Sequence, residues 1–252
     1  MDSVTEKRRR LLGASWYSPL DAHRFTFGDR SFSPEEIVDR LAPYLTDERA
    51  ARIDEVLDGR THRLATVVEG LVNMGNVSAV MRSAEALGCQ PFHVITGGAT
   101  FKNSRRTSQG AEKWLDVYRW ATPGDCVAYL HDEGYRIVAT HLDDSSVSID
   151  SVDFSEPTAV VFGNERDGVS AEMVSLADER AIVPMVGFVQ SFNISVAAAV
   201  TLYHAYRDRK ARLGRHGDLT SDERAALRAA FYLRSVRAAE NILCASAAEM
   251  SD

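Results

Sequence analysis

Two glycine-bearing loops and one arginine are the features of this sequence whose residue types and spacing could do chemistry. The first loop, residues 163–170, contains Gly163 and Gly168 between a strand-like apolar run and a short helix. This is the GxxxxG spacing of a phosphate-binding loop, but Val169 stands where such a loop requires lysine, which argues against a nucleoside triphosphate. The pattern predicts a strand–loop–helix turn whose backbone can approach a ligand closely. An ordinary turn with two convenient glycines is the alternative.

The second loop, residues 183–193, also lies between a strand-like segment and a helix. Three polar residues, Ser191, Asn193 and Ser195, occupy five positions there before an apolar helix. Serine and asparagine commonly cap helices, and capping explains one of these residues better than it explains all three. The small residues 197–199 that follow would let the helix backbone pack closely against a neighbour.

Arg82 lies on a largely apolar helix that is predicted to begin near Asn76. An arginine in such a place either extends its guanidinium to solvent or directs it at an anion. Taken alone, the first alternative is favoured.

Composition excludes several classes of function. The 252 residues include 29 Lys and Arg against 36 Asp and Glu, a formal charge of −7, which argues mildly against a nucleic-acid partner for the chain as a whole. Short basic runs at 7–10, 102–106 and 207–212 are nevertheless local exceptions, although such runs are usually solvated faces. The three cysteines form no CxxC and the histidines no HExxH, so we expect no metal site. Without a secretory signal or an apolar run of about 20 residues, we expect a cytoplasmic protein with no membrane partner.

From residue 64 onward, short apolar runs alternate with helical patterns, and these elements must position the residues described above. This alternation predicts an α/β fold with a mainly parallel sheet that is buried on both faces. Residues 1–32 show no sustained period and are interpreted as an irregular or partly ordered arm, followed by helices over about 33–45 and 46–57. One helix is expected over 222–245. The predicted strands are 64–69, 91–95, 114–120, 135–140, 158–162 and 181–185, and the helices between them are 77–87, 125–133, 170–176 and 193–210.

Three segments together resemble the three motifs of the SpoU, or TrmH, branch of the knotted SPOUT RNA methyltransferases. They are residues 76–82, 161–170 and 183–197. Any one motif would be weak, but three in this order and spacing are specific. The resemblance covers roughly residues 46–215 and is strongest to the members that methylate guanosine 18 of tRNA.

The resemblance implies a C-terminal deep trefoil knot, which periodicity alone does not predict. It divides the chain into an N-terminal arm with helices (1–62), a SPOUT methyltransferase domain (63–215) and a C-terminal helical extension (216–252). It also implies S-adenosylmethionine as cofactor and a homodimer that pairs through knot helices. Positions that match the family's cofactor contacts are Thr140, Gly163, Val183, Met185, Ser191 and Phe192.

The same resemblance assigns the remaining site residues. Arg82 matches the catalytic arginine, and Asn76, Glu165, Asn193 and Ser195 match other active-site positions. Arg207 and Arg209 match arginines that contact tRNA. Methyl transfer from a sulfonium to a ribose 2′-hydroxyl needs no metal, because the cofactor carries the reactivity. Since a guanidinium barely deprotonates, we expect Arg82 to hold a phosphate and stabilise the developing alkoxide, and leave a direct base role open.

Alternative functions differ in substrate or in class. A 23S ribosomal RNA 2′-O-methyltransferase is the first, but such enzymes typically carry a separate N-terminal α/β domain, so tRNA is favoured. A non-catalytic RNA-binding module on the same fold is the second, and the presence of Arg82, Glu165 and Asn193 argues against it. A nicotinamide-dependent oxidoreductase is least favoured, because no GxGxxG follows the first strand.

Overall fold

The computed structural model describes residues 24–27, 29–70, 74–97, 108–143, 145–164, 167–189 and 191–245. These residues form two compact units, an α/β unit of residues 61–216 and a helical unit of residues 24–60 and 217–245. Glu165 lies outside the described residues. No helix in the described ranges combines the length and apolar character that crossing a membrane requires.

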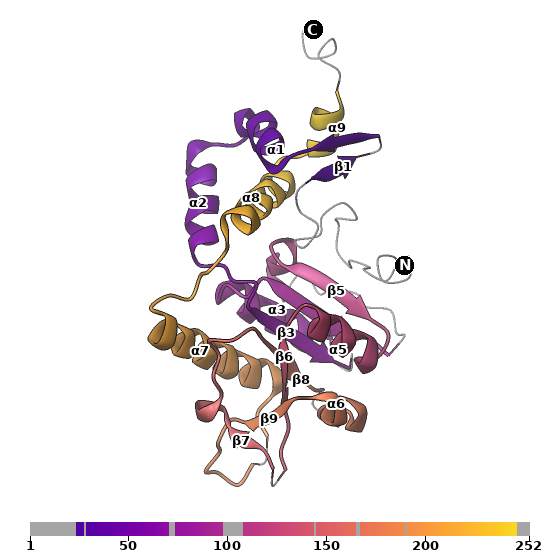
Figure 1. Ribbon diagram of the computed structural model, residues 1–252, viewed down its shortest axis with the longest axis vertical. Helices are drawn as coiled ribbons and strands as arrows, with labels where there is room; N and C mark the ends of the chain where they lie inside the picture. Colours follow the sequence, from indigo (N-terminus) through magenta and orange to yellow (C-terminus); the bar gives the residue numbers. More distant parts are fainter. Residues whose placement is uncertain are drawn as a thin grey trace. The chain divides into compact units, whose positions relative to one another are not determined.

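A seven-stranded sheet in the order β5-β4-β3-β8-β6-β9-β7 forms the centre of the α/β unit (Figure 1). Every strand pair in it is parallel, which confirms the predicted fold class. The trefoil knot stays a prediction. The strands are β3 (Leu64–Glu69), β4 (Pro91–Ile95), β5 (Asp116–Trp120), β6 (Arg136–Thr140), β7 (Val147–Ser148), β8 (Thr158–Phe162) and β9 (Glu179–Ile182).

Helices cover both faces of this sheet, because successive side chains of a strand point to opposite sides. In β8, Val160 and Phe162 join the core beneath α3 and α7, whereas Ala159 and Val161 join the core beneath α5 and α6. The helices are α3 (Met74–Ala86), α5 (Pro123–Asp132), α6 (Ala171–Leu176) and α7 (Ile194–Leu213), with 3-10 turns η4 (Ala111–Lys113) and η5 (Ile149–Ser151). Strands buried on both sides explain the unbroken apolar runs of the sequence.

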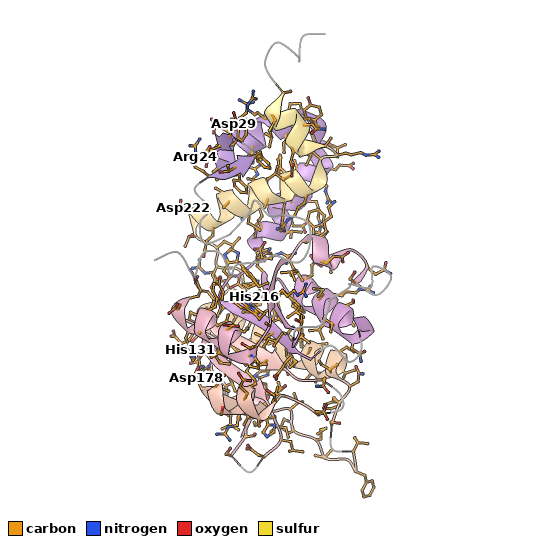
Figure 2. All side chains as sticks on the ribbon, turned by 90° about the vertical axis from the view of Figure 1, so that its right-hand side faces the viewer. Arg24, Asp29, His131, Asp178, His216 and Asp222 are labelled. Atoms are coloured by element: carbon orange, nitrogen blue, oxygen red, sulfur yellow. The ribbon has the colours of Figure 1, made fainter. Side chains whose placement is uncertain are left out.

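Two histidines of the α/β unit have structural partners. His93 of β4 is fully buried, accepts a 3.0 Å hydrogen bond from the indole N–H of Trp120 and stacks on Tyr118 at 4.7 Å. Burial lowers the pKa of His93 to about 3, so its imidazole is neutral. His131 and Asp178 lie side by side (Figure 2), with Nε2 and Oδ2 3.0 Å apart, in the last turn of α5 and just before β9.

The helical unit combines segments from both flanks of the chain. It contains a hairpin of β1 (Phe25–Phe27) and β2 (Arg30–Phe32), helices α1 (Pro34–Leu41) and α2 (Asp47–Asp58), the 3-10 turn η3 (Ala42–Tyr44), and helices α8 (Ser221–Ser235) and α9 (Ala239–Cys244). Helix α1 packs on α8 and α9, and α2 packs on α8. Ion pairs from Arg224 to Asp58 (2.7 Å) and from Arg228 to Asp54 (3.1 Å) join α8 to α2.

Two elements of this unit add to or differ from the sequence-based expectations. The arm predicted to be irregular or partly ordered contains the β1–β2 hairpin, in which Phe25 pairs with Phe32. The single helix predicted over 222–245 ends at Ser235, because Val236 adopts extended backbone with a ψ of 128°, and α9 begins only after Ala238, which has a left-handed φ of 57°. A left-handed residue cannot continue a right-handed helix, so the chain changes direction there.

Candidate functional site

The carboxyl ends of β3 and β8 mark the point where the strand order reverses. The chain leaves β3 through α3 toward β4 on one side, and leaves β8 through α6 toward β9 on the other. Open α/β sheets bind ligands in the crevice outside such a point. The helix of the first motif (76–82) follows β3 and the loop of the second motif (161–170) follows β8, so both lie at this edge. Thr140, the last residue of β6, and Val183, which follows β9, lie at the same edge.

The loop of residues 163–170 is closed by its own backbone. Asn164 and Gly168 exchange two backbone hydrogen bonds of 3.1 and 3.0 Å, and the N–H of Asp167 donates to the Asn164 side chain at 2.9 Å. A Cβ on Gly163 would lie 2.0 Å from the carbonyl carbon of Gly168, and Gly168 itself has a φ of +69°. Gly163 is thus required by the close approach of the loop to itself, and Gly168 by its left-handed backbone conformation.

Glu69, the last residue of β3, is a functional candidate that sequence reasoning missed. Its buried carboxylate accepts a 2.9 Å hydrogen bond from the backbone N–H of Ser170, where α6 begins. The Asn164 side chain also reaches the end of β3, with Nδ2 2.9 Å from where a Cβ of Gly70 would lie. A signal was present, because Glu69 is the only charged residue in an otherwise uncharged strand. Glu69 therefore anchors the loop of the second motif (161–170) to β3, the strand that precedes the helix of the first motif.

Two ionisable side chains near this edge, Cys126 and Asp143, have shifted pKa values. Burial, and then the carboxylate of Glu69, raise the pKa of the Cys126 thiol well above its usual value, which keeps that thiol protonated. Hydrogen bonds, first from the Ser145 side chain and also from Arg180, hold the pKa of Asp143 well below its usual range. The Arg180–Asp143 pair, at 3.1 Å, ties the loop after β6 to β9.

Helix α3 presents Arg82 on its exposed side. Val80 and Met81 are buried against the sheet, Asn76 in the first turns is half-buried, and Arg82 is exposed. None of the carboxylates that the structure describes forms an ion pair with Arg82. The guanidinium is therefore available to an anion from outside the chain, and exposure to solvent alone remains the alternative.

The loop after β9 has main-chain groups that lie outside any ladder. Beyond the β7–β9 pairing, residues 184–189 make no backbone–backbone hydrogen bond within the described ranges, and all of them except Met185 are exposed. Solvent satisfies exposed main-chain groups, and a ligand that binds through main-chain N–H and C=O groups would displace that water. Thr140 closes the neighbouring strand end, because its hydroxyl donates to the Val161 carbonyl at 2.9 Å. These features fit the backbone-held cofactor that the sequence analysis expects.

The start of α7 holds the polar residues of the third motif. Asn193 caps the helix, since its Oδ1 accepts from the Ser195 N–H at 3.0 Å and from the Ser195 hydroxyl at 2.6 Å. Capping thus accounts for this pair, while the exposed Ser191 is not part of the cap. Phe192 is also exposed, at 41%. Asn193 therefore fixes the orientation of the Ser195 hydroxyl, a hydrogen-bonding group at the end of the loop of residues 183–193.

The two arginines expected to contact RNA have different environments. Arg207 is exposed on α7. Arg209 is 0% exposed, and its guanidinium donates to the Phe154 carbonyl at 3.0 Å and to the Thr61 hydroxyl at 3.5 Å. The prediction of Arg209 as an RNA contact is therefore wrong, because this side chain joins α7 to the interior of the α/β unit. Among the described residues, no group of three His, Cys, Asp or Glu is arranged to hold a metal ion.

Comparisons with known proteins agree with this geometry. The model of the SpoU rRNA Methylase family matches residues 63–203. The tRNA (guanosine(18)-2′-O)-methyltransferase of Escherichia coli (strain K12) is 39% identical over 162 residues, which cover 64% of this chain and 71% of that protein. The crystal structure of the A. aeolicus TrmH/SpoU tRNA modifying enzyme matches with a TM-score of 0.68 and 31% identity, over 76% of this chain and 98% of that chain. The SpoU methyltransferase AviRb from Streptomyces viridochromogenes, in complex with the cofactor AdoMet, matches with a TM-score of 0.54 and 26% identity, over 61% and 62% of the two chains.

Proposed function

Because this chain belongs to the SpoU rRNA Methylase family, we propose that it is an RNA methyltransferase that methylates a ribose 2′-hydroxyl with S-adenosylmethionine. The relative named for guanosine 18 of tRNA supports that nucleotide as the target, and the AdoMet complex of AviRb supports the cofactor. An rRNA substrate and a non-catalytic RNA-binding role are the alternatives, and the relative's name favours neither. The observation that carries the proposal is that helix α3, which carries Arg82, follows β3 and the 163–170 loop follows β8, the two neighbouring strands between which the strand order reverses.

The cofactor would lie against the ends of β6, β8 and β9. The main-chain groups of 183–189 would hold it, together with Thr140, Gly163 and the adjoining Ser191 and Phe192. S-adenosylmethionine supplies an electrophilic methyl group on a sulfonium. The chain's part is to orient that methyl toward the hydroxyl, and Glu69 serves this by anchoring the 163–170 loop to β3.

Arg82 is the residue to which we assign stabilisation of the reacting oxygen. Its exposed and unpaired guanidinium would grip the phosphate beside the target ribose and face the alkoxide as the proton leaves. Asn76, Glu165, Asn193 and Ser195 complete the proposed catalytic set. The hydroxyl of Ser195, held at 2.6 Å from the Asn193 Oδ1, is the member with the best defined orientation.

Partners of the chain follow from the exposed side of α7. Val196 and Val200 are 46% and 41% exposed and lie four residues apart on one side of the helix, so they form an apolar stripe. A second copy of the chain would cover this stripe in a homodimer, and Arg207 would contact RNA. We assign the methyltransferase domain to residues 63–215, with 1–62 and 216–252 as flanking extensions, and place the protein in the cytoplasm with its RNA.

Nucleoside mapping by mass spectrometry tests the proposed activity. Purified protein is incubated with S-adenosylmethionine, a chelator and an unmodified tRNA transcript, and a transcript with adenosine at position 18 serves as the control. We expect one 2′-O-methylguanosine, at position 18, and none in the control. Methylation of a 23S rRNA transcript instead would replace the substrate, and methylation of neither RNA would refute the proposal. Calorimetry of the cofactor alone with the chelator tests binding separately, and a strict requirement for a divalent ion would contradict it.

A further inference from the structure

The second half of α7 carries a surface of which the proposed function assigns only Arg207, as an RNA contact. Tyr203, Tyr206, Arg207 and Lys210 are all partly or fully exposed there, and we call them the aromatic–basic face. They recur at three- and four-residue spacing, so one side of the helix presents them together. This face begins where the apolar stripe ends, since Val196 and Val200 precede it on the same side.

Contacts among these four side chains give the face a defined geometry. The rings of Tyr203 and Tyr206 lie 6.2 Å apart at an angle of 20°. The Arg207 guanidinium donates to the Tyr203 hydroxyl at 3.4 Å, and the Lys210 ammonium lies 5.5 Å from the centre of the Tyr206 ring. Both cations thus lie beside a phenol ring, and neither pairs with a carboxylate among the residues that the structure describes. An aromatic ring can stack on the base of a nucleotide, and a neighbouring cation can bind its phosphate.

Tyr206 has a rigid support and an open side. The buried His216 contacts its ring with a centroid distance of 4.8 Å, which restricts its rotation. Tyr206, Arg207, Lys210 and Ala211 line a hollow of about 490 Å³. That volume lies within the range of about 300–1,000 Å³ that is usual for small-molecule sites. The ring is therefore held in place next to a space that accepts a planar group.

We propose that the aromatic–basic face is a subsite for one unstacked nucleotide of the RNA substrate, outside the methyl-transfer site. Its base would stack on Tyr206, and its phosphate would contact Arg207 and Lys210. This inference rests on the proposed function, which supplies the RNA. A local site of this kind also explains how a chain of net charge −7 can hold a polyanion, because two unpaired cations concentrate attraction at one place.

A second copy of the chain fits this face less well than RNA does. Lysine is depleted from the centres of protein–protein interfaces, whereas lysine and arginine beside aromatic rings are typical of single-stranded nucleic-acid sites. The apolar stripe of α7 already offers the surface that a protein partner would cover. Arg207 marks the point along the helix where the character of the surface changes from apolar to cationic.

The test measures the affinity of an unmodified tRNA transcript for the full chain at several salt concentrations. Tyr206→Leu should weaken binding on the order of 10-fold, the usual effect of losing one stacked base, while Tyr206→Phe should bind normally because the ring is kept. Lys210→Gln should reduce the slope of log affinity against log salt by about 0.7–0.9, the contribution of one neutralised phosphate. Arg212→Gln is the matched control on the same helix, since its cation is already paired with Asp208 at 2.8 Å and with Asp153 at 3.4 Å.

Outcomes separate this inference from the proposed function. Turnover at saturating tRNA should be unchanged in Tyr206→Leu and Lys210→Gln, and only the tRNA concentration for half-saturation should rise. If wild-type protein methylates tRNA and both variants bind it normally, the subsite is refuted and the function stands. If the variants instead lose dimers in light scattering, the face is a protein interface and the inference is also refuted. If wild-type protein neither binds nor methylates tRNA, the proposed function is refuted, and the subsite, which rests on it, is refuted with it.

Discussion

Replacing Gly163 with alanine should disable the loop that follows β8. The new Cβ would lie 2.0 Å from the carbonyl carbon of Gly168, 2.1 Å from the nitrogen of Val169 and 2.3 Å from the oxygen of Gly168. All three atoms are backbone, so no side-chain rotation relieves the contacts. The two strands of the loop must separate, which breaks the paired hydrogen bonds between Asn164 and Gly168.

The free energy of that distortion can be assembled from its parts. Two backbone hydrogen bonds contribute about 1 kcal/mol each, and overpacking costs roughly 1–3 kcal/mol, so the distortion amounts to about 3–5 kcal/mol. At about 1.4 kcal/mol per factor of ten, the original loop conformation falls to a population of roughly one in 10²–10⁴. If S-adenosylmethionine binds only that conformation, its apparent Kd should rise by about the same factor.

Calorimetry with S-adenosylmethionine measures this effect on a graded series of alanine variants. Gly59→Ala is the control, since its Cβ would meet only the Val56 carbonyl, at an ordinary 3.6 Å. Gly168→Ala has open space but a φ of +69°, so it should cost about 1–2 kcal/mol and weaken binding roughly 5- to 30-fold. A Gly163→Ala protein that melts cooperatively and binds the cofactor within threefold of wild type would contradict the reasoning.

Three further predictions concern single residues. Arg82→Ala should lower single-turnover methylation of tRNA on the order of 10²–10³-fold with cofactor affinity unchanged, and Arg82→Lys should recover little; turnover near wild type would mean that Arg82 is merely solvent-exposed. Arg209→Met should lower the free energy of unfolding in urea by roughly 1.5–3 kcal/mol, because the Phe154 carbonyl loses a charged donor, whereas Arg207→Ala should unfold like wild type. His93 has a pKa of about 3 in the folded chain, below its usual 6.5, so the unfolded chain binds an extra proton between these values and stability falls as pH falls. His93→Gln should remove this dependence, a relative gain approaching 1.4 kcal/mol per pH unit below 6.5, and an unchanged difference between pH 6.5 and 4.5 would contradict it.

The sequence predicts the α/β unit well because its signals are local. A strand such as β8 is apolar throughout since both faces are buried, and Pro157 and Gly163 bound it. Helix caps are equally local, as the capping box between Ser33 and Glu36 shows at the start of α1. Three ordered motifs then predict the candidate site, because the first lies in the helix after β3, the second follows β8 and the third follows β9.

Features that depend on distant partners were not predictable in this way. Arg209 belongs to a basic run, and only the fold brings the Phe154 carbonyl to it. Glu69 acts on Ser170, about a hundred residues later in the chain. The β1–β2 hairpin has strands of three residues, too short to show a period, and the left-handed turn at Ala238 is formed by a residue type that ordinarily favours helix.

The helical unit, built from both flanks of the chain, imposes an order on synthesis. Ile37 and Leu41 of α1 are buried in a unit whose other half, α8 and α9, emerges from the ribosome last. At about 5–20 residues per second, the 185 residues between Arg60 and Ala245 take roughly 9–37 s to translate. During that interval α1 and α2 lack the helices they pack against, while the intervening α/β unit is completed. The nascent chain therefore exposes the apolar faces of α1 and α2 until α8 and α9 emerge, and during that interval these faces are available to a chaperone.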